Sequence, residues 1–250
     1  MPNHEVIVHT PHHDKSFDTL QFQEIELVLY TYRQRYNTYA SRGQVYIFQN
    51  HGHEAGESLH HPHSQLVVVP FDIKLEIPPL PLIHWDIQQG EAIPWFTQKW
   101  WGWPDESQQE NGGAGGEESV TTEHFYLFCP QASEWPDEVW IAPKKAGEEF
   151  GDINDAQLKD FAFVLTRLIQ LFDLRHGQAF PYNFYIYPGK NWYLRLIPRI
   201  KVLGGFELGT GIMVNTQEPE KTMEFIHEHF KEPNIEKIKT QHQADYRKKV

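Results

Sequence analysis

The sequence predicts an α+β fold that is built twice, with a mostly antiparallel sheet and helices packed on it. Two observations support this prediction. A unit of strand, polar loop and amphipathic helix occurs twice along the chain, and a short apolar run at residues 66–69 directly follows a histidine-rich segment. The first observation indicates a duplicated scaffold, and the second indicates a buried strand that carries chemistry in only one copy.

The repeated unit begins with an apolar strand and continues into a helix whose apolar positions are three and four residues apart, as in a helix that buries one face. The copies overlay without a gap, because the interval from Phe17 to Phe150 equals the interval from Tyr32 to Leu165. The matched positions are Glu5–Val8, Phe17, Leu20, Ile25, Val28 and Tyr32 in the first copy, and Glu138–Ile141, Phe150, Ile153, Leu158, Phe161 and Leu165 in the second.

Further elements complete each copy. We expect strands at 44–49 and 66–69 in the first copy, and at 183–187 and 192–197 in the second. Asn154 and Asp155 suit the start of the second helix, because side-chain oxygens accept free N–H groups there. A last helix is expected at about 219–230.

The composition divides the chain into four parts. The first half is 1–104. Its last part, from residue 71, is rich in Pro and Trp and is expected to form an irregular cover over the core. Residues 105–120 form a Gly-rich, flexible linker. The second half is 121–232, and 233–250 is a polar tail.

Bulk properties exclude several classes of protein. A formal net charge of −12 argues against broad nucleic-acid or anionic-membrane binding, because both need a basic surface. No run approaches the ~18 apolar residues of a membrane span, and we expect no signal peptide. Cys129 is the only cysteine, which excludes an internal disulfide and a cysteine-rich metal site. A cytoplasmic protein with small-molecule partners is expected.

The segment Asn50–Gln65 carries the chemistry, and its core is His61-Pro62-His63-Ser64-Gln65. Alternate residues of an extended strand point to one side, so His61, His63 and Gln65 would share a face. A neutral imidazole, with an unperturbed pKa of ~6.5, can attack phosphorus and form a phosphoramidate. His63 fits this role best, because Pro62 stiffens the backbone before it and nearby carbonyls can accept a hydrogen bond from its far nitrogen.

Other polar groups of the segment suit an anionic substrate. Gln65 and Ser58 can donate to phosphoryl oxygens, and Gly52 and Gly56 let backbone N–H groups approach an anion closely. The corresponding part of the second copy contains no histidine. One half therefore carries the chemistry, and the other is interpreted as scaffold.

The pattern Asn50-x-Gly52-x-x-x-Gly56-x-Ser58-x-x-His61-Pro62-His63-x-Gln65 resembles the active-site signature of the galactose-1-phosphate uridylyltransferase family, the transferase branch of the histidine-triad superfamily. The lead-in His4–Val8 with Pro11 and His13, and the late segment Lys201-x-x-x-Gly205-Phe206-Glu207, are also similar to the family. The resemblance spans about residues 3–230. It implies a duplicated histidine-triad-like fold in which only the first half is catalytic.

The resemblance also implies roles. His63 would carry a uridylyl group from UDP-glucose to a hexose 1-phosphate in a ping-pong reaction of galactose metabolism. Gln65 and Ser58 would hold phosphoryl oxygens, and Asn50 would orient the site. Lys201 and Glu207 would bind the hexose phosphate from a segment lent across a homodimer. Glutamine at position 65, where related hydrolases have histidine, favours transfer over hydrolysis.

The chain departs from the family at its zinc site. The family holds a structural zinc with a Cys-x-x-Cys pair and two histidines, which fall here at His13 and His61, so two of the four ligands of a closed site are present. The upstream cysteines and the segment that supplies much of the uracil pocket are missing. The sequence is then either a fragment of a longer gene or a shortened protein that has lost its metal. His12, His51, His53 and His60 are interpreted as solvent-facing, or as ligands of a replacement site.

Several alternatives stay open. The same histidine could carry AMP in an ADP-sugar phosphorylase, or the chain could be a truncated, non-catalytic binding relative. His13 and His61 are either zinc ligands or rings packed near the nucleophile. Arg195 or Arg199 could meet phosphate, and the tryptophans Trp95, Trp100, Trp101 and Trp103 either pack a loop onto the sheet or stack on a base.

Overall fold

The computed structural model describes residues 3–78, 80, 120–130, 132–177, 179–233, 236 and 238, together with the backbone of 82–86 and 91–94. The first half contains β1 (His4–Val8), α1 (Phe22–Tyr39), β2 (Gln44–His51), β3 (His63–Val69) and the hairpin of β4 (Leu82–Asp86) and β5 (Glu91–Pro94). The second half contains β6 (Val120–Thr121), β7 (Phe125–Phe128), β8 (Val139–Pro143), α2 (Asp155–His176), β9 (Tyr182–Ile186), β10 (Leu194–Pro198), α3 (Gly205–Thr210) and α4 (Pro219–His229). Short 3₁₀ turns lie at His53–Ala55 and Phe150–Asp152.

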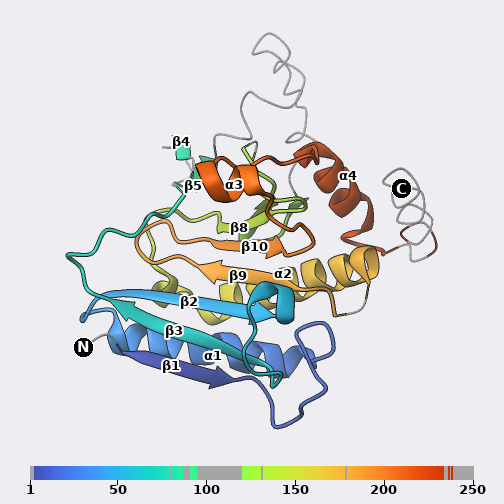
Figure 1. Cartoon of the computed structure of the whole chain (residues 1–250). Coiled ribbons are helices and arrows are strands. Elements are labelled where there is room, and N and C mark those ends of the chain that lie inside the picture. Colours follow the sequence, from blue (N-terminus) through green and yellow to red (C-terminus); the bar gives the residue numbers. More distant parts are fainter. Residues whose placement is uncertain are drawn as a thin grey trace.

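Within the described residues, the main sheet has eight strands in the order β1-β3-β2-β9-β10-β8-β7-β6, and its neighbouring strands are antiparallel. β2 and β9 pair at the centre, followed by β3 and β1 on one side and by β10 and β8 on the other. α1 and α2 cover the same face of this sheet, one behind each half (Figure 1). The α+β class and the duplication are therefore confirmed.

The gapless overlay of the two copies holds in the helices and is wrong in the first strands. α1 begins at Phe22 and α2 begins at Asp155, which are matched positions of that overlay. In the strands, Ile7 and Ile141 both face the helices, whereas Trp140 faces the opposite side of the sheet. The strands therefore match with a shift of one position, because the pair Ile7–Ser64 corresponds to the pair Ile141–Leu194.

The core between sheet and helices follows from the amphipathic pattern of the sequence. α1 buries a stripe of five residues: Ile25, Val28, Leu29, Tyr32 and Tyr36. α2 begins as expected, since the Asn154 side chain accepts a hydrogen bond from the Gln157 N–H at 2.9 Å. α4 contributes Met223, Phe225 and Ile226 to the same core.

A second cluster lies on the face of the sheet away from the helices and within the second half. It contains Phe128, Trp140, Tyr187 and Tyr193, with Ile77 and Leu80 packed against it. The Tyr193 hydroxyl also donates a hydrogen bond to the Pro78 carbonyl. The expected cover is therefore present at Ile77, Pro78 and Leu80.

Two expectations need correction. The stretch 71–104 is not irregular throughout, because β4 and β5 form a hairpin within it. The tail is not wholly peripheral, because Ile238 is 1% exposed and belongs to the main core. Most of the linker 105–120 and the four tryptophans of the cover lie outside the described residues. Within the described residues, no helix is both long and apolar enough to cross a membrane.

Candidate active site

His63 is the first residue of β3 and is 5% exposed. Its Nδ1 lies 2.8 Å from the carbonyl oxygen of His61. A carbonyl oxygen can only accept, so Nδ1 must carry the hydrogen and Nε2 keeps its lone pair. The ring is therefore held in the tautomer that a nucleophile requires. His61 precedes the strand, so only His63 and Gln65 of the expected trio lie on the same face of β3.

The strands bring two further signature residues beside His63. Phe48 of β2 pairs with Gln65, so the antiparallel register places Asn50 opposite His63 two residues further on. The Gln65 side-chain oxygen accepts a hydrogen bond from His4 Nε2 at 2.9 Å. This bond occupies the acceptor end of the carboxamide and does not engage the N–H donors that a phosphoryl oxygen would need.

The loop after β2 contains both signature glycines in the left-handed region, with φ values of 86° at Gly52 and 80° at Gly56. The Gly52 N–H donates to the Glu57 carboxylate at 2.8 Å, and the Gly56 N–H donates to the His53 carbonyl at 3.0 Å. Neither N–H is free to bind an anion in this conformation. The expectation of a backbone phosphate cradle thus finds no support here, and both glycines serve the turn. Ser58 follows the loop and is exposed.

Asn183 of β9 is a site-supporting residue that the sequence analysis missed. Its side-chain nitrogen donates to Asn50 Oδ1 and to the Ala55 carbonyl, both at 2.8 Å. Asn183 is 4% exposed and is the Cα partner of Asn50 across the central strand pair. It thus ties the glycine loop to the second half. The signal was present in the sequence, because Asn183 is the position that the gapless overlay of the two copies matches to Asn50.

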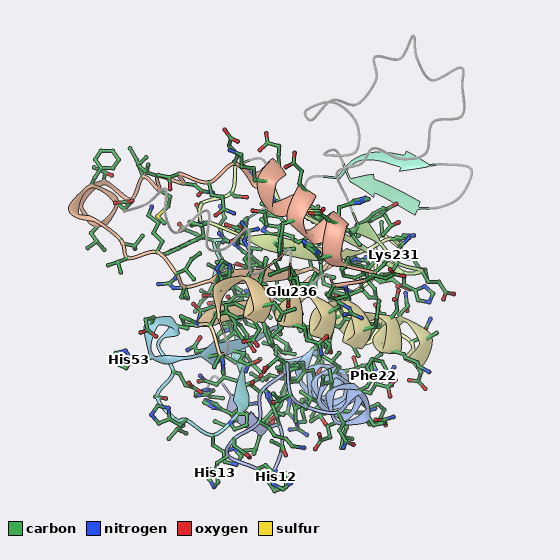
Figure 2. The ribbon with its side chains drawn as sticks, turned by 90° about the vertical axis from the view of Figure 1, so that its right-hand side faces the viewer. His12, His13, Phe22, His53, Lys231 and Glu236 are labelled. Atoms are coloured by element: carbon green, nitrogen blue, oxygen red, sulfur yellow. The ribbon has the colours of Figure 1, made fainter. Side chains whose placement is uncertain are left out.

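His13 and His61 lie together, with ring centroids 4.5 Å apart and nearly perpendicular planes. The Nδ1 of His61 is buried without a hydrogen-bond partner, as expected of a nitrogen that binds a metal. His13 is exposed, and it points outward at the bottom of Figure 2. Among the described residues, however, no three His, Cys, Asp or Glu side chains are grouped to hold a metal. The described residues thus bring together two of the expected zinc ligands and do not complete a four-ligand site.

The other histidines do not form a replacement metal site within the described residues. His12, His53 and His60 are exposed, and Figure 2 shows His12 and His53 projecting from the fold. His51 is different, because its ring packs on Tyr182 with centroids 4.8 Å apart and burial lowers its pKa.

Lys201 and Glu207 bind each other, with 2.7 Å between Lys201 Nζ and the carboxylate. The same ammonium group donates to the Val214 carbonyl, and Glu207 accepts from the Gly204 N–H at 3.1 Å. α3, which contains Glu207, lies over the second half of the sheet and away from β3 (Figure 1). A single chain therefore does not bring this pair to His63.

Arg195 of β10 and Arg199, which follows β10, both contact other side chains of the fold. Arg195 binds Glu138 at 2.7 Å and Glu134 at 3.0 Å, and is 7% exposed. Arg199 stacks its guanidinium over the Trp135 ring, 4.1 Å from the centroid. The idea that Arg195 meets a phosphate is wrong for this conformation, because two carboxylates already neutralise it.

The chain is similar in sequence to several known proteins. Residues 3–70 match the family model described as galactose-1-phosphate uridyl transferase, N-terminal domain. ADP-glucose phosphorylase of Arabidopsis thaliana is 26% identical over 246 residues, covering 90% of this chain and 64% of that protein. Galactose-1-phosphate uridylyltransferase of Thermotoga maritima is 24% identical over 243 residues, covering 90% of this chain and 73% of the relative. The chain thus spans less than two thirds of the Arabidopsis protein.

Solved structures share the fold. An ADP-glucose phosphorylase from Arabidopsis thaliana with bound ADP-glucose superposes with a TM-score of 0.69 at 23% identity, covering 91% of this chain and 74% of the other. A uridylyltransferase structure gives a TM-score of 0.68 at 20% identity, with coverage of 91% and 74%. At this identity the likeness establishes the architecture alone.

Proposed function

We propose that this chain, which is related to the galactose-1-phosphate uridylyltransferases, is an enzyme that transfers a nucleotidyl group through a covalent intermediate on His63. One observation carries the proposal. His63 holds its Nδ1–H against the His61 carbonyl, which leaves the Nε2 lone pair as the nucleophile, beside the carboxamide of Gln65. The related proteins are named as uridylyltransferases and as an ADP-glucose phosphorylase, which fits this class of chemistry.

In the proposed first step, His63 Nε2 attacks the α-phosphorus of a nucleotide sugar. The new P–N bond replaces the bond from that phosphorus to the bridging oxygen, and the sugar 1-phosphate leaves with the bonding electron pair. The ring becomes cationic, and the Nδ1–H bond to the His61 carbonyl stabilises it without any proton leaving. In the second step an acceptor phosphate oxygen attacks the same phosphorus, the P–N bond breaks, and Nε2 recovers its lone pair. Gln65 and Ser58 donate to the phosphoryl oxygens, and Asn50 orients the loop.

For the substrates, we propose UDP-glucose and a hexose 1-phosphate, in a ping-pong reaction of galactose metabolism. The test is to incubate the folded protein with UDP-glucose labelled in the α-phosphate, then digest it at alkaline pH, where phosphoramidates survive. A uridylylated peptide that contains His63 is expected, and the His63→Asn protein should give none. A folded protein with no label from any nucleotide sugar would instead favour a non-catalytic binding relative.

ADP-sugar phosphorylase chemistry is the second candidate. The observation that favours it is the similarity to ADP-glucose phosphorylase over 90% of this chain. Here His63 would carry AMP, and inorganic phosphate would be the acceptor in the second step. Labelling with ADP-glucose and UDP-glucose in parallel, followed by a chase with inorganic phosphate or galactose 1-phosphate, separates the two candidates. The productive pair identifies the reaction.

We also propose a cytoplasmic homodimer in which Lys201 and Glu207 reach the partner's His63. Supporting this, the segment 200–214 carries exposed apolar side chains, including Val202 at 90% and Leu208 at 72% exposure. Light scattering measures the dimer directly. Mixing His63→Asn chains with Lys201→Ala chains should restore partial activity, because one site of each mixed dimer keeps both residues. Zinc at His13 and His61 needs ligands beyond those described, so about one zinc per chain in metal analysis would show that ligands come from elsewhere.

A further inference from the structure

A buried polar cluster lies directly behind His63, on the side of the sheet that faces the helices. Ser64 is fully buried, and its Oγ lies 2.7 Å from His9 Nε2 and is hydrogen-bonded to the Tyr32 hydroxyl. The Tyr32 hydroxyl also lies 3.2 Å from His9 Nε2. The three groups come from β3, from the residue after β1, and from α1. Long-range contacts of this kind fix three elements relative to one another.

His9 holds the chain on both sides of His63. Its backbone N–H donates to the Pro62 carbonyl at 3.0 Å, and its ring binds Ser64. Pro62 and Ser64 are the two neighbours of His63 in the sequence. One residue therefore fixes the backbone immediately before and immediately after the nucleophile. The angle at which His63 presents Nε2 depends on that backbone.

The cluster is uncharged around neutral pH. Burial, and then the nearby rings of His63, His51 and His61, lower the pKa of His9 to about 3. Burial also raises the pKa of Tyr32 well above its usual range, so its hydroxyl keeps its hydrogen. The Tyr32 hydroxyl can donate to Ser64, and Ser64 can donate to His9 Nε2. Such a chain places no positive charge behind the ring of His63.

The second half shows that the fold does not need these polar groups. In the equivalent positions of the sheet and helix, Ser64 corresponds to Leu194, Tyr32 to Leu165 and His9 to Pro143. All three counterparts are buried and apolar. Buried polar groups need partners and gain little over an apolar core of the same shape. The polar cluster occurs in the half that carries the nucleophile, so a role in that site is the simplest reason for it.

We propose that His9, backed by Ser64 and Tyr32, is a positioning residue that holds His63 Nε2 in line with the phosphorus. The proposal rests on the proposed function, since it concerns the same nucleophile. Positioning acts on the rate of the chemical step more than on substrate binding, because a displaced nucleophile still leaves the binding groups in place. The expected signature is a fall in kcat with a nearly constant KM.

The kinetic test compares three variants with a matched control. His9→Phe keeps an aromatic ring against Phe17 and removes the ring nitrogens. Ser64→Ala and Tyr32→Phe each delete one hydroxyl. Each should lower kcat by about 10- to 100-fold, with KM changed by less than about three-fold. His9→Gln should recover part of the loss, because its amide can bond to Ser64. The control, Tyr36→Phe, lies one turn along α1, loses a hydroxyl bond to Glu149, and should leave kcat unchanged.

A second measurement needs no turnover and separates this proposal from the proposed function. Nitrogen-15 NMR should show His63 of the wild type as the pure Nδ1–H tautomer, and a mixture of tautomers in the variants. If the wild type forms no nucleotidyl adduct, the proposed function fails, while this comparison still decides the positioning role. An unchanged tautomer and kcat in Ser64→Ala and Tyr32→Phe overturn the proposal, even if His9→Phe does not fold. Losses of equal size in Tyr36→Phe overturn it as well, because they indicate general destabilisation.

Discussion

The two halves of the sheet share one backbone plan, but the face away from the helices differs between them. In the first half, β3 presents His63 and the half-buried Gln65. At the equivalent positions, the second half presents Tyr193, the residue before β10, and Arg195 of β10. Tyr193 stacks on Trp140 with ring centroids 4.5 Å apart, and Arg195 forms a buried ion pair with Glu138. The same register thus supports a polar surface of histidine and carboxamide in one half and a closed aromatic cluster in the other.

The difference teaches how a duplicated fold can separate its tasks. Aromatic rings and a satisfied ion pair fill this face of the second half, and Ile77 and Leu80 pack against the aromatic rings. The first half keeps a histidine with a free ring nitrogen and a carboxamide, groups that contribute little to packing. We therefore expect substitutions at β3 to change chemistry, and substitutions at the equivalent places of the second half to change stability.

The largest effect is expected at His63. His63→Asn removes the proposed nucleophile and should lower nucleotidyl transfer by at least about 1,000-fold, because the proposed covalent route is lost. Tyr193→Phe, at the equivalent place, loses only the hydroxyl bond to the Pro78 carbonyl and should keep its activity. Steady-state kinetics and the labelling of His63 measure both. Comparable losses in the two variants would contradict the division of tasks.

The second effect is on stability. Arg195→Met should lower the free energy of unfolding by about 3–5 kcal/mol, because the buried carboxylate of Glu138 loses its cationic partner. Gln65→Leu, at the equivalent place in β3, should cost less than about 1 kcal/mol and should slow transfer instead, since it deletes the N–H groups proposed to donate to phosphoryl oxygens. Urea unfolding and kinetics on both proteins give the comparison. An Arg195→Met protein as stable as the wild type would show that the ion pair only replaces hydration.

Much of this arrangement could be predicted from the sequence. Apolar periodicity located the main strands and helices, and the spacing of the histidine signature located His63. The register of the repeat could not be predicted. Glu5 and Glu138 begin similar segments of sequence, but their side chains lie on opposite faces of the sheet. Glu5 faces α1 and binds Arg35, whereas Glu138 binds Arg195 on the opposite face. A slip of one residue in a strand exchanges its two faces, and two similar residues concealed that slip.

The buried polar cluster behind His63 could not be predicted from the sequence either. His9, Ser64 and Tyr32 lie in three separate segments, and each is an ordinary residue where it stands. The sequence did contain one signal. Ser64 alternates along β3 with Leu66 and Val68, so its side chain points inward with theirs. A polar residue that points inward needs a buried partner, but the sequence does not say which.

The third prediction concerns acid stability, which should differ between the halves because His9 corresponds to Pro143. The pKa of His9 is lowered to about 3 in the folded protein, from an ordinary value near 6.5. The unfolded chain therefore binds a proton first as pH falls, so stability is full above about 6.5 and declines toward 3. At pH 5 the loss from this residue is about 2 kcal/mol. His9→Phe should remove this part of the pH dependence, as measured by urea unfolding at pH 7 and pH 5. An unchanged dependence of stability on pH would mean that His9 is solvated or charged in the folded protein. His51, His61 and His63 are the other imidazoles that affect the pKa of His9.

The smallest effect tests the point where the second half serves the first. Asn183→Ala removes the two hydrogen bonds to Asn50 and Ala55, which should cost about 1–2 kcal/mol and loosen the glycine loop. Because this loop lies beside His63 without containing it, KM for the nucleotide sugar should rise several-fold while labelling of His63 still occurs. Asn37→Ala is the matched control, since it removes a hydrogen bond to the Gly151 carbonyl, which also joins the two halves but lies on the helix side. If both variants lose stability and only Asn183→Ala changes KM, the second half contributes to the site through this one strand pair. If neither changes KM, the second half supports the sheet alone.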